Sequence, residues 1–359
     1  MRRAAIGLFL LAPWTAECSW GGFTLADFPV VVAILAPLYG GAAVLIREVT
    51  RRAGRGWPTI VLLAAAFGFV QAGLVDQSLL NPEFLDDTEF RDLATTAQAT
   101  VIPGLGISAE QVLDYVGNHI ALSIAAPIAL VESLVAPQRR HEPWLGRPGL
   151  AIVTLLYLGG SLLIYADTAG SDAYAPRPVQ VTVVVGVILV LVGAAFAVRP
   201  QTVRSGPQTV RAGQRAVVHP LVVGGLVAVA HLASWPASGW AGVALRLAVA
   251  TVVVVVVVRW SRRPGWGQAY VLAAWGAGLV VAAGTAYLVP TYAPAPPHLA
   301  LASDIAISIV TAAMLGVAAW RLRRHRPADR RETGQPEAGQ PETGEPQPPT
   351  AGPHQRVAS

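Results

Sequence analysis

Charged residues are scarce in this chain of 359 residues, and lysine is absent. Asp, Glu, Lys and Arg make up only 13% of the sequence, against about 25% in an ordinary soluble domain. Hydrophobic residues make up 53%. A soluble protein of this composition could not cover its surface with polar groups, whereas a chain in lipid has no such need. The composition therefore excludes an ordinary soluble domain and indicates an integral membrane protein.

Cysteine occurs once, at Cys18, which excludes an internal disulfide framework and a metal site built on cysteines. The formal net charge is +5, but the arginines stand in short clusters between apolar segments. A nucleic-acid partner is therefore not expected. The motifs HExxH and GxSxG and a glycine-rich phosphate loop are also missing from any predicted helix or loop that could use them. We accordingly predict no catalytic residue, no metal and no cofactor.

Long apolar runs, by contrast, are abundant. A spanning helix needs about 20 mostly apolar residues, and ten runs fit this length: 4–21, 28–46, 57–80, 112–136, 149–168, 178–198, 219–235, 240–258, 267–289 and 301–320. The uninterrupted valines at 252–258 argue against the alternating strands of an outer-membrane barrel. The sequence thus predicts an all-α fold, a polytopic transmembrane helical bundle of about ten spanning helices within residues 1–324.

The arginines support this count, because basic residues concentrate in cytoplasmic loops. If the loops face alternate sides, nearly all arginines fall on the side of the N-terminus, and the other side holds only Arg91, Arg177 and the acidic loop 81–111. This pattern predicts a protein of the plasma or inner membrane with both termini in the cytoplasm. The arginine clusters are then expected to contact anionic lipid headgroups.

Both ends of the chain carry a further prediction. Arg2 and Arg3 before a short apolar run also fit a signal peptide, whose cleavage would leave nine helices. The retained helix is favoured, because residues 15–17 lack the small residue that cleavage requires at their end. Residues 325–359 repeat ETGQP, EAGQP and ETGEP. Low hydrophobicity with regular Pro and Gly predicts a disordered cytoplasmic tail.

Ionisable residues inside spanning segments are costly and are therefore candidates for function. Nearly all of them lie in the outer halves of the predicted helices. The candidate substrate-binding residues are Gln71, Asn118, His119, His231 and Arg246, and the candidate pairing carboxylates are Glu17, Asp76, Asp114 and Asp304. This one-sided depth predicts a polar cavity, or a buried hydrogen-bonded cluster, open toward the outer side.

Simpler explanations remain open for most of these residues. A carboxylate near a helix end can reach water, and Asp114 and Asp304 also favour the positive end of a helix dipole. Both histidines can serve as packed core residues; His119 and Ser123, four apart, can pair with each other. Arg246 stays charged, so it must reach water or pair with a carboxylate.

Three segments carry a family resemblance: PLYGGAAVLIREVTRRAGRGWP at 37–58, AFGFVQAGLVDQSLLNP at 66–82, and NHIALSIAAPIALVESL at 118–134 with PWLGR at 143–147. They resemble a family of bacterial multi-pass membrane proteins with no assigned activity. Relatives tend to carry paired glutamates where this chain has Gln71 and Ala72. That arrangement is distantly similar to CPBP-type intramembrane proteases, whose carboxylates and histidines are catalytic. This chain keeps His119 but lacks the glutamates, so the resemblance does not carry acid–base chemistry over to it.

Three function classes follow from the sequence. The first is a transporter or permease-like protein with an outward-facing polar site for a small molecule or lipid, which requires the candidate residues to converge around a common space. Against it, no internal repeat relates the two halves of the chain, as it does in many transporters. The second is a non-catalytic membrane scaffold or sensor. The third is a membrane enzyme, or a degenerate relative of an intramembrane protease, acting on lipid or peptide.

Overall fold

The computed structural model describes residues 1–171, 174–198, 218–233 and 237–324. In these residues the regular structure is helical, with no strand and one isolated bridge between Val101 and Ser108. The predicted all-α fold is thus confirmed for the part of the chain that is described.

Eight helical segments of the described chain are long and apolar enough to cross a membrane. Three of them contain a π-helical turn. They are α2 (Phe28–Leu35), η2 (Ala36–Gly40) and α3 (Gly41–Arg52); α4 (Trp57–Val70) and η3 (Gln71–Val75); and α6 (Ala109–Asn118), η5 (His119–Ala125) and α7 (Ala126–Leu134). The others are α8 (Arg147–Ser171), α9 (Pro178–Ala197), α11 (Gly239–Ser261), α12 (Gln268–Thr285) with η7 (Ala286–Leu288), and α13 (Pro297–Arg324).

The prediction of ten spanning helices is therefore wrong in number. The apolar runs at 4–21 and 219–235 form shorter helices in the described residues. The first consists of α1 (Arg2–Pro13, 12 residues) and η1 (Trp14–Cys18, 5 residues), and the second is α10 (Pro220–Ala233, 14 residues). At 1.5 Å per residue, 14 residues reach about 21 Å, short of the roughly 30 Å hydrocarbon core.

The first run is short because the chain turns at Gly21. This residue has φ +95°, and a Cβ on it would lie 2.9 Å from the backbone of Ala286. Glycine is the residue that accepts both the left-handed backbone and so close an approach. The helix therefore ends before the 20 residues that its apolar composition led us to expect.

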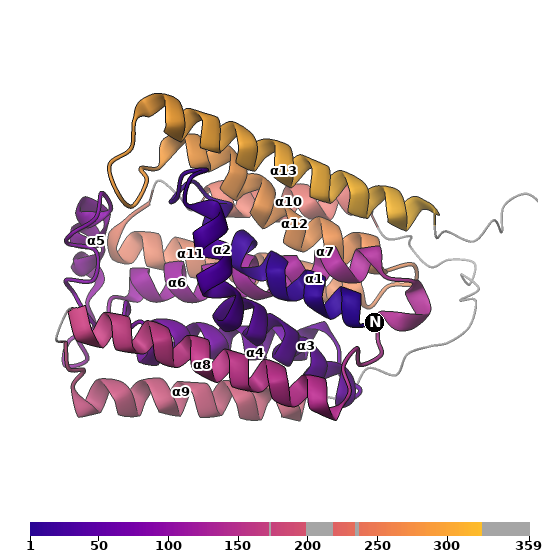
Figure 1. Ribbon diagram of the computed structural model, residues 1–359, viewed down its shortest axis with the longest axis horizontal. Coiled ribbons are helices and arrows are strands. Elements are labelled where there is room, and N and C mark those ends of the chain that lie inside the picture. The colour runs from indigo at the N-terminus through magenta and orange to yellow at the C-terminus, as the bar shows by residue number, and fades with distance from the viewer. Residues whose placement is uncertain (172–173, 199–217, 234–236, 325–359) are drawn as a thin grey trace, which may run out of the picture. The chain divides into compact units, whose positions relative to one another are not determined.

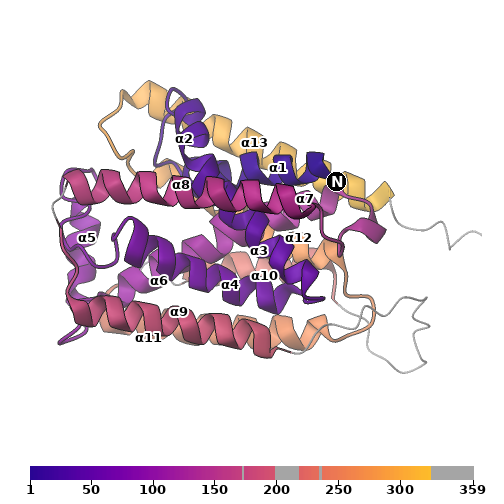
Figure 2. The same cartoon turned by 60° about the horizontal axis from the view of Figure 1, so that its bottom comes forward.

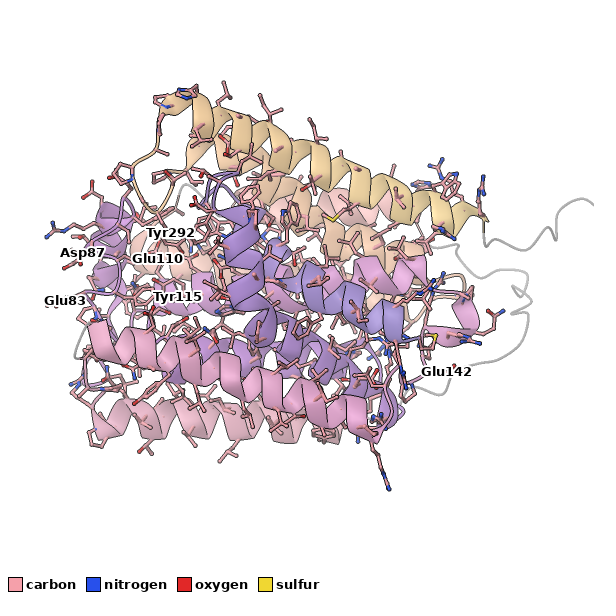
Figure 3. All side chains as sticks on the ribbon, in the orientation of Figure 1. Glu83, Asp87, Glu110, Tyr115, Glu142 and Tyr292 are labelled. Atoms are coloured by element: carbon pink, nitrogen blue, oxygen red, sulfur yellow. The ribbon has the colours of Figure 1, made fainter. Side chains whose placement is uncertain are left out.

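The long helices run along one axis in alternating directions, whereas α2 and the short α5 lie across it (Figures 1 and 2). The N-terminus lies at the same end as the end of α7, the start of α8 and the end of α13 (Figure 1). We call this the arginine-rich end, because it carries the arginines of α3, of the 135–146 loop and of α13. The opposite end carries the short helix α5 (Arg91–Ala97) and the acidic residues Glu83 and Asp87, whereas Glu142 lies at the arginine-rich end (Figure 3).

The core is made of small and aliphatic side chains from α1, η2, α3, α4, η5 and α7, among them Leu8, Leu38, Ile60, Ile124 and Ile128, all fully buried. Glycines let the backbones approach closely, as is common between helices in membranes. A Cβ on Gly40 would overlap the carbonyl oxygen of Phe9, and one on Gly41 would lie 2.9 Å from Cβ of Tyr157. The Gly40–Gly41 pair thus packs α1 on one side and α8 on the other.

Candidate functional site

Four π-helical turns bring polar side chains into the described bundle. Glu17 lies on η1, Tyr39 on η2, Gln71 on η3, and His119 with Ser123 on η5. A π-helical turn changes the direction in which the following side chains point, and such turns are frequent at functional sites. These five residues and Asp76 form one group inside the bundle, which we call the buried polar cluster.

One half of the buried polar cluster is built around Tyr39. Its hydroxyl donates to Oε1 of Glu17 at 2.5 Å. The ring of His119 packs against those of Tyr39 and Phe67, with centroids 5.8 Å and 5.5 Å away. Nδ1 of His119 lies 3.1 Å from Oγ of Ser123, the pair that the sequence spacing suggested. A carboxyl, a phenol and an imidazole thus lie together inside the helical bundle.

The other half of the cluster lies where α4 and η3 end. Nε2 of Gln71 donates to Asp76 at 3.0 Å, and the same carboxylate accepts from the backbone of Ser78 at 2.9 Å. Oε1 of Gln71 and Oε1 of Gln77 are both buried and accept no hydrogen bond from the residues that are described. Gln77 also has φ +58°, a left-handed conformation that costs energy in a residue other than glycine.

Aromatic residues from three loops lie beside this cluster. Tyr292 packs against Trp20, Phe23 and Phe90, with ring centroids 5.0 to 5.6 Å from its own. Tyr292 and Tyr115 lie on the side of the opposite end (Figure 3). Tyr292 is within electrostatic range of Glu17, and burial raises its pKa well above the usual value. Bulky side chains, rather than open water, therefore adjoin the cluster on this side.

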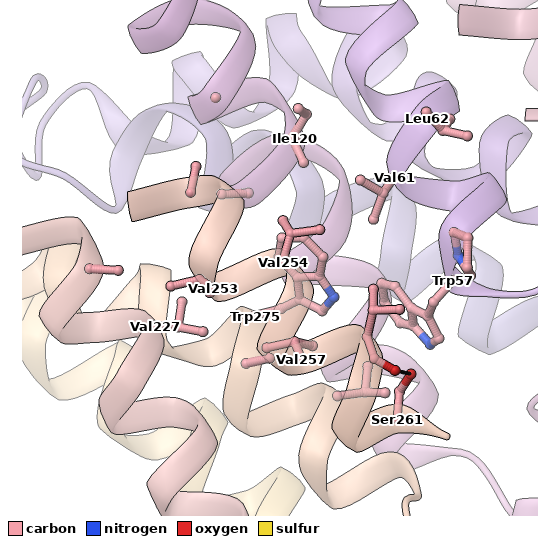
Figure 4. A pocket seen from close by; sticks show the side chains of 18 of the residues that line it. Trp57, Val61, Leu62, Ile120, Val227, Val253, Val254, Val257, Ser261 and Trp275 are labelled. Carbon is pink, nitrogen blue, oxygen red and sulfur yellow. Dashed lines mark hydrogen bonds between the residues drawn. The ribbon is translucent and has the colours of Figure 1, made fainter. Parts of the chain in front are cut away.

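A large groove lies on the other side of α6 and η5. Its volume is about 1580 Å³, and it is lined by α4, α6, η5, α10, α11 and α12. This exceeds the usual 300–1,000 Å³ of a ligand pocket. The middle is apolar, with Val61, Ile120, Val227, Val254 and Trp275 among the lining side chains (Figure 4).

Polar residues line the part of the groove that lies away from the arginine-rich end. They are Asp114, Asn118, His231 and Arg246. Nη1 of Arg246 donates to Asp114 at 2.7 Å, and Nη2 donates to Glu110 at 3.3 Å. Of the two possibilities that the sequence left open for Arg246, reaching water or pairing with a carboxylate, the structure shows pairing.

The structure places eight of the nine candidate residues in two sites. Asn118, His231, Arg246 and Asp114 line the groove, whereas Gln71, His119, Glu17 and Asp76 belong to the buried polar cluster. Asn118 and His119 are neighbours in the chain but face different sites. Asp304 joins neither group: it lies on α13 next to Ser303, whose hydroxyl accepts from the backbone of Leu25 at 2.9 Å.

A third group, at the arginine-rich end, did not appear among the candidates. Glu132 accepts from Nε of Arg47 at 3.0 Å and from Nη2 of Arg51 at 2.9 Å on each carboxylate oxygen. Glu48 accepts from Arg47 at 3.1 Å and from the backbone of Trp144 at 2.7 Å. The side chains of Arg47, Arg51, Glu48 and Glu132 are at most 2% exposed.

This ion-pair network joins the motifs of the family resemblance. Arg47 and Glu48 come from LIRE, Glu132 from ALVE, and Trp144 from PWLGR. The guanidinium of Arg47 stacks on the Trp144 ring, 3.2 Å from its centroid. The sequence already indicated that Glu132 needs a partner, because it is a lone carboxylate near the inner end of its predicted helix. Arginines follow it in the next loop.

Neither the cluster nor the network forms a metal site. Within the described residues no three His, Cys, Asp or Glu side chains stand together in a way that could hold a metal ion. Comparison of the chain with protein-family models, with curated proteins and with solved structures gives no match. The function is therefore argued from the groove, the cluster and the network themselves.

Proposed function

We propose that the protein is a permease-like membrane protein that binds an amphipathic, lipid-like molecule in the groove and moves it between the two faces of the bilayer. The groove carries this proposal. It is apolar along its middle and polar at both ends, as an amphipathic substrate requires. An apolar passage offers nothing to replace the hydration shell of an ion, which argues for a lipid-like rather than an ionic substrate.

The length of the groove supports the same function. Its lining residues on α11 and directly after it extend from Arg246 to Arg262, about 24 Å at 1.5 Å per residue. The hydrocarbon core is roughly 30 Å thick. The groove therefore follows most of the path from one headgroup region to the other.

The arginine distribution supports an orientation for this path. With the arginine-rich end in the cytoplasm, as the positive-inside rule favours, Asp114, His231 and Arg246 face outward. Both described chain ends, at Met1 and Arg324, then lie on the cytoplasmic side of the inner membrane. The outward-facing polar site of the proposal is the Arg246–Asp114 end of the groove.

The test uses proteoliposomes that contain the full chain and a lipid with a fluorescent headgroup, whose accessibility to an impermeant quencher reports movement between leaflets. Val254→Trp fills the groove (Figure 4). Val252→Trp is the matched control, because Val252 lies on the same helix, is equally exposed at 59%, and does not line the groove. We expect Val254→Trp to slow movement strongly and Val252→Trp to leave it unchanged. No protein-dependent movement, or equal effects of the two variants, would reject the transport proposal.

The buried polar cluster favours a second candidate function, a membrane enzyme. Glu17, Tyr39 and His119 lie close together and take part in two hydrogen-bonded pairs, an arrangement suited to proton transfer. In the same proteoliposomes, turnover of a lipid or of a membrane-spanning peptide is followed by mass spectrometry. Turnover that Glu17→Gln or His119→Asn abolishes, and Val254→Trp does not, would support the enzyme. Absence of both movement and turnover would favour the scaffold or sensor.

A further inference from the structure

We propose that the arginine-rich end of the groove binds the headgroup phosphate of an anionic glycerophospholipid, with an acyl chain along the valines of α11. This inference rests on the proposed function for the use of the groove, and it names the substrate class. It concerns recognition of the headgroup rather than movement of the lipid, so the two can be tested separately.

The charge at this end of the groove is positive and unbalanced. Arg55, Arg140 and Arg262 line it, together with His141 and Gln268. Among the described residues that line the groove, Asp114 is the only carboxylate, and it lies at the opposite end. Burial and the nearby Arg51 lower the pKa of His141. The arginines therefore supply the charge that an anion would meet.

Arg140 is held in place but incompletely bonded. Its Nε donates to the carbonyl oxygens of Glu132 and Val135, both at 3.0 Å, which fixes the guanidinium at the end of α7. The residue is 9% exposed, and its buried Nη2 finds no hydrogen-bond partner among the described residues. Leaving such a donor unpaired costs roughly 1–3 kcal/mol, more for a charged group. Arg140 lines this end of the groove, so a shift of its guanidinium toward a bound anion would supply the missing partner.

Arg262 provides a second, more accessible cation. It is the residue that follows α11, and it is exposed. Its guanidinium makes no hydrogen bond or ion pair to any residue that the structure describes, in contrast to Arg55, whose guanidinium donates to Phe196 at 2.5 Å. Arg140, in the loop after α7, and Arg262, directly after α11, thus line the same end of the groove, and each has donors without a partner among the described residues.

Aromatic residues mark the depth of this end. Trp57 stacks on Trp275 with centroids 6.0 Å apart, and Trp266 stacks on Tyr270 at 4.7 Å. Trp and Tyr are enriched where headgroups meet the hydrocarbon core. A phosphate between Arg140 and Arg262 would lie at headgroup level, and the valines 253, 254, 257 and 258 lead from there into the apolar part of the groove. The combination of phosphate donors and an acyl path identifies a phospholipid rather than a free phosphate.

The experiment is native mass spectrometry of the full-length protein in detergent with three probes: phosphatidylglycerol, phosphatidylcholine of the same acyl chains, and inorganic phosphate. We expect retention of phosphatidylglycerol over phosphatidylcholine. Arg262→Gln should weaken that retention about tenfold, as expected for loss of one charge-assisted hydrogen bond. Arg263→Gln is the matched control, because Arg263 is the next residue and does not line the groove. The effect of Arg262→Gln does not depend on folding contacts, whereas Arg140→Gln also removes the bonds at the end of α7.

Equal retention of the two lipids, or equal loss in Arg262→Gln and Arg263→Gln, would overturn the inference in favour of diffuse surface charge. Displacement of phosphatidylglycerol by millimolar phosphate would overturn the choice of a lipid. Selective retention that depends on Arg262 without any movement in proteoliposomes would reject transport and keep the headgroup site. Movement of lipid in proteoliposomes without selective retention of phosphatidylglycerol would reject the headgroup site and keep transport.

Discussion

The arginine-rich end holds buried ion pairs between side chains that are at most 2% exposed. Arg47 and Arg51 share the carboxylate of Glu132 in a site that water does not reach. Forming such a pair recovers little net energy, because both charges lose their hydration. Removing one partner is costly, because the other charge remains buried and uncompensated.

Glu132→Gln should therefore destabilise the protein severely, by about 3–5 kcal/mol. The measurement is the midpoint of thermal unfolding in detergent. Glu142→Gln is the control, because that side chain is exposed and only its backbone oxygen accepts from Arg47. Similar midpoints for both variants would show that the ion-pair network is not important for stability.

The sequence identified residues better than their surroundings. The sequence analysis placed Asn118 and His119 in one candidate site, although neighbouring residues of a helix do not share a face. Consecutive residues of a helix point about 100° apart, so His119 joins Tyr39 while Asn118 lines the groove. Glu132 was visible in the sequence, but its partners lie on a different helix and in a loop, which spacing along one chain cannot reveal.

The positions of most helices could be predicted from the length and composition of the apolar runs. The residues at which the helices end were harder to predict. The runs at 4–21 and 219–235 are apolar enough to span a membrane, but the helices there end early. At Gly21 a contact with Ala286 decides where the chain turns. Such a contact joins two segments far apart in the sequence, so no local pattern contains it.

Close helix packing gives a prediction at this scale. Gly40→Ala should destabilise the bundle, because the added methyl group would overlap the backbone of α1 at Phe9. Overpacking of this kind costs typically 1–3 kcal/mol. Thermal unfolding in detergent measures the effect, and Gly159→Ala on α8 is the control, since a Cβ there meets no atom within 4 Å. A larger loss in Gly159→Ala would mean that α1 does not pack on η2 as described.

The molecule as a whole has one strongly basic end, which underlies the proposed orientation. Glu83 and Asp87 lie at one end of the described chain and Glu142 at the other (Figure 3). The alternation of arginines predicted this polarity even though the number of spanning helices was wrong. Two of the apolar runs form short helices that still run along the same axis, so the alternation of chain direction is kept (Figure 1).

Cysteine accessibility tests the orientation. Asp87→Cys and Glu142→Cys are made separately in a Cys18→Ser background, where the native thiol is buried in any case. In intact cells an impermeant thiol reagent should label Asp87→Cys and not Glu142→Cys, and permeabilised cells should show labelling of both. The opposite pattern in intact cells would invert the proposed orientation.

The pair between Arg47 and Glu132 also has a consequence for biogenesis. The two residues are 85 positions apart, so at 5–20 residues per second the ribosome needs roughly 4–17 s to make the second after the first. During that interval Arg47 has only Glu48 beside it, and Arg51 lacks the carboxylate of Glu132. Unpaired arginine is costly inside lipid. The end of α3 must therefore wait at the aqueous face of the membrane, and closure of the bundle becomes a late step that the arrival of α7 permits.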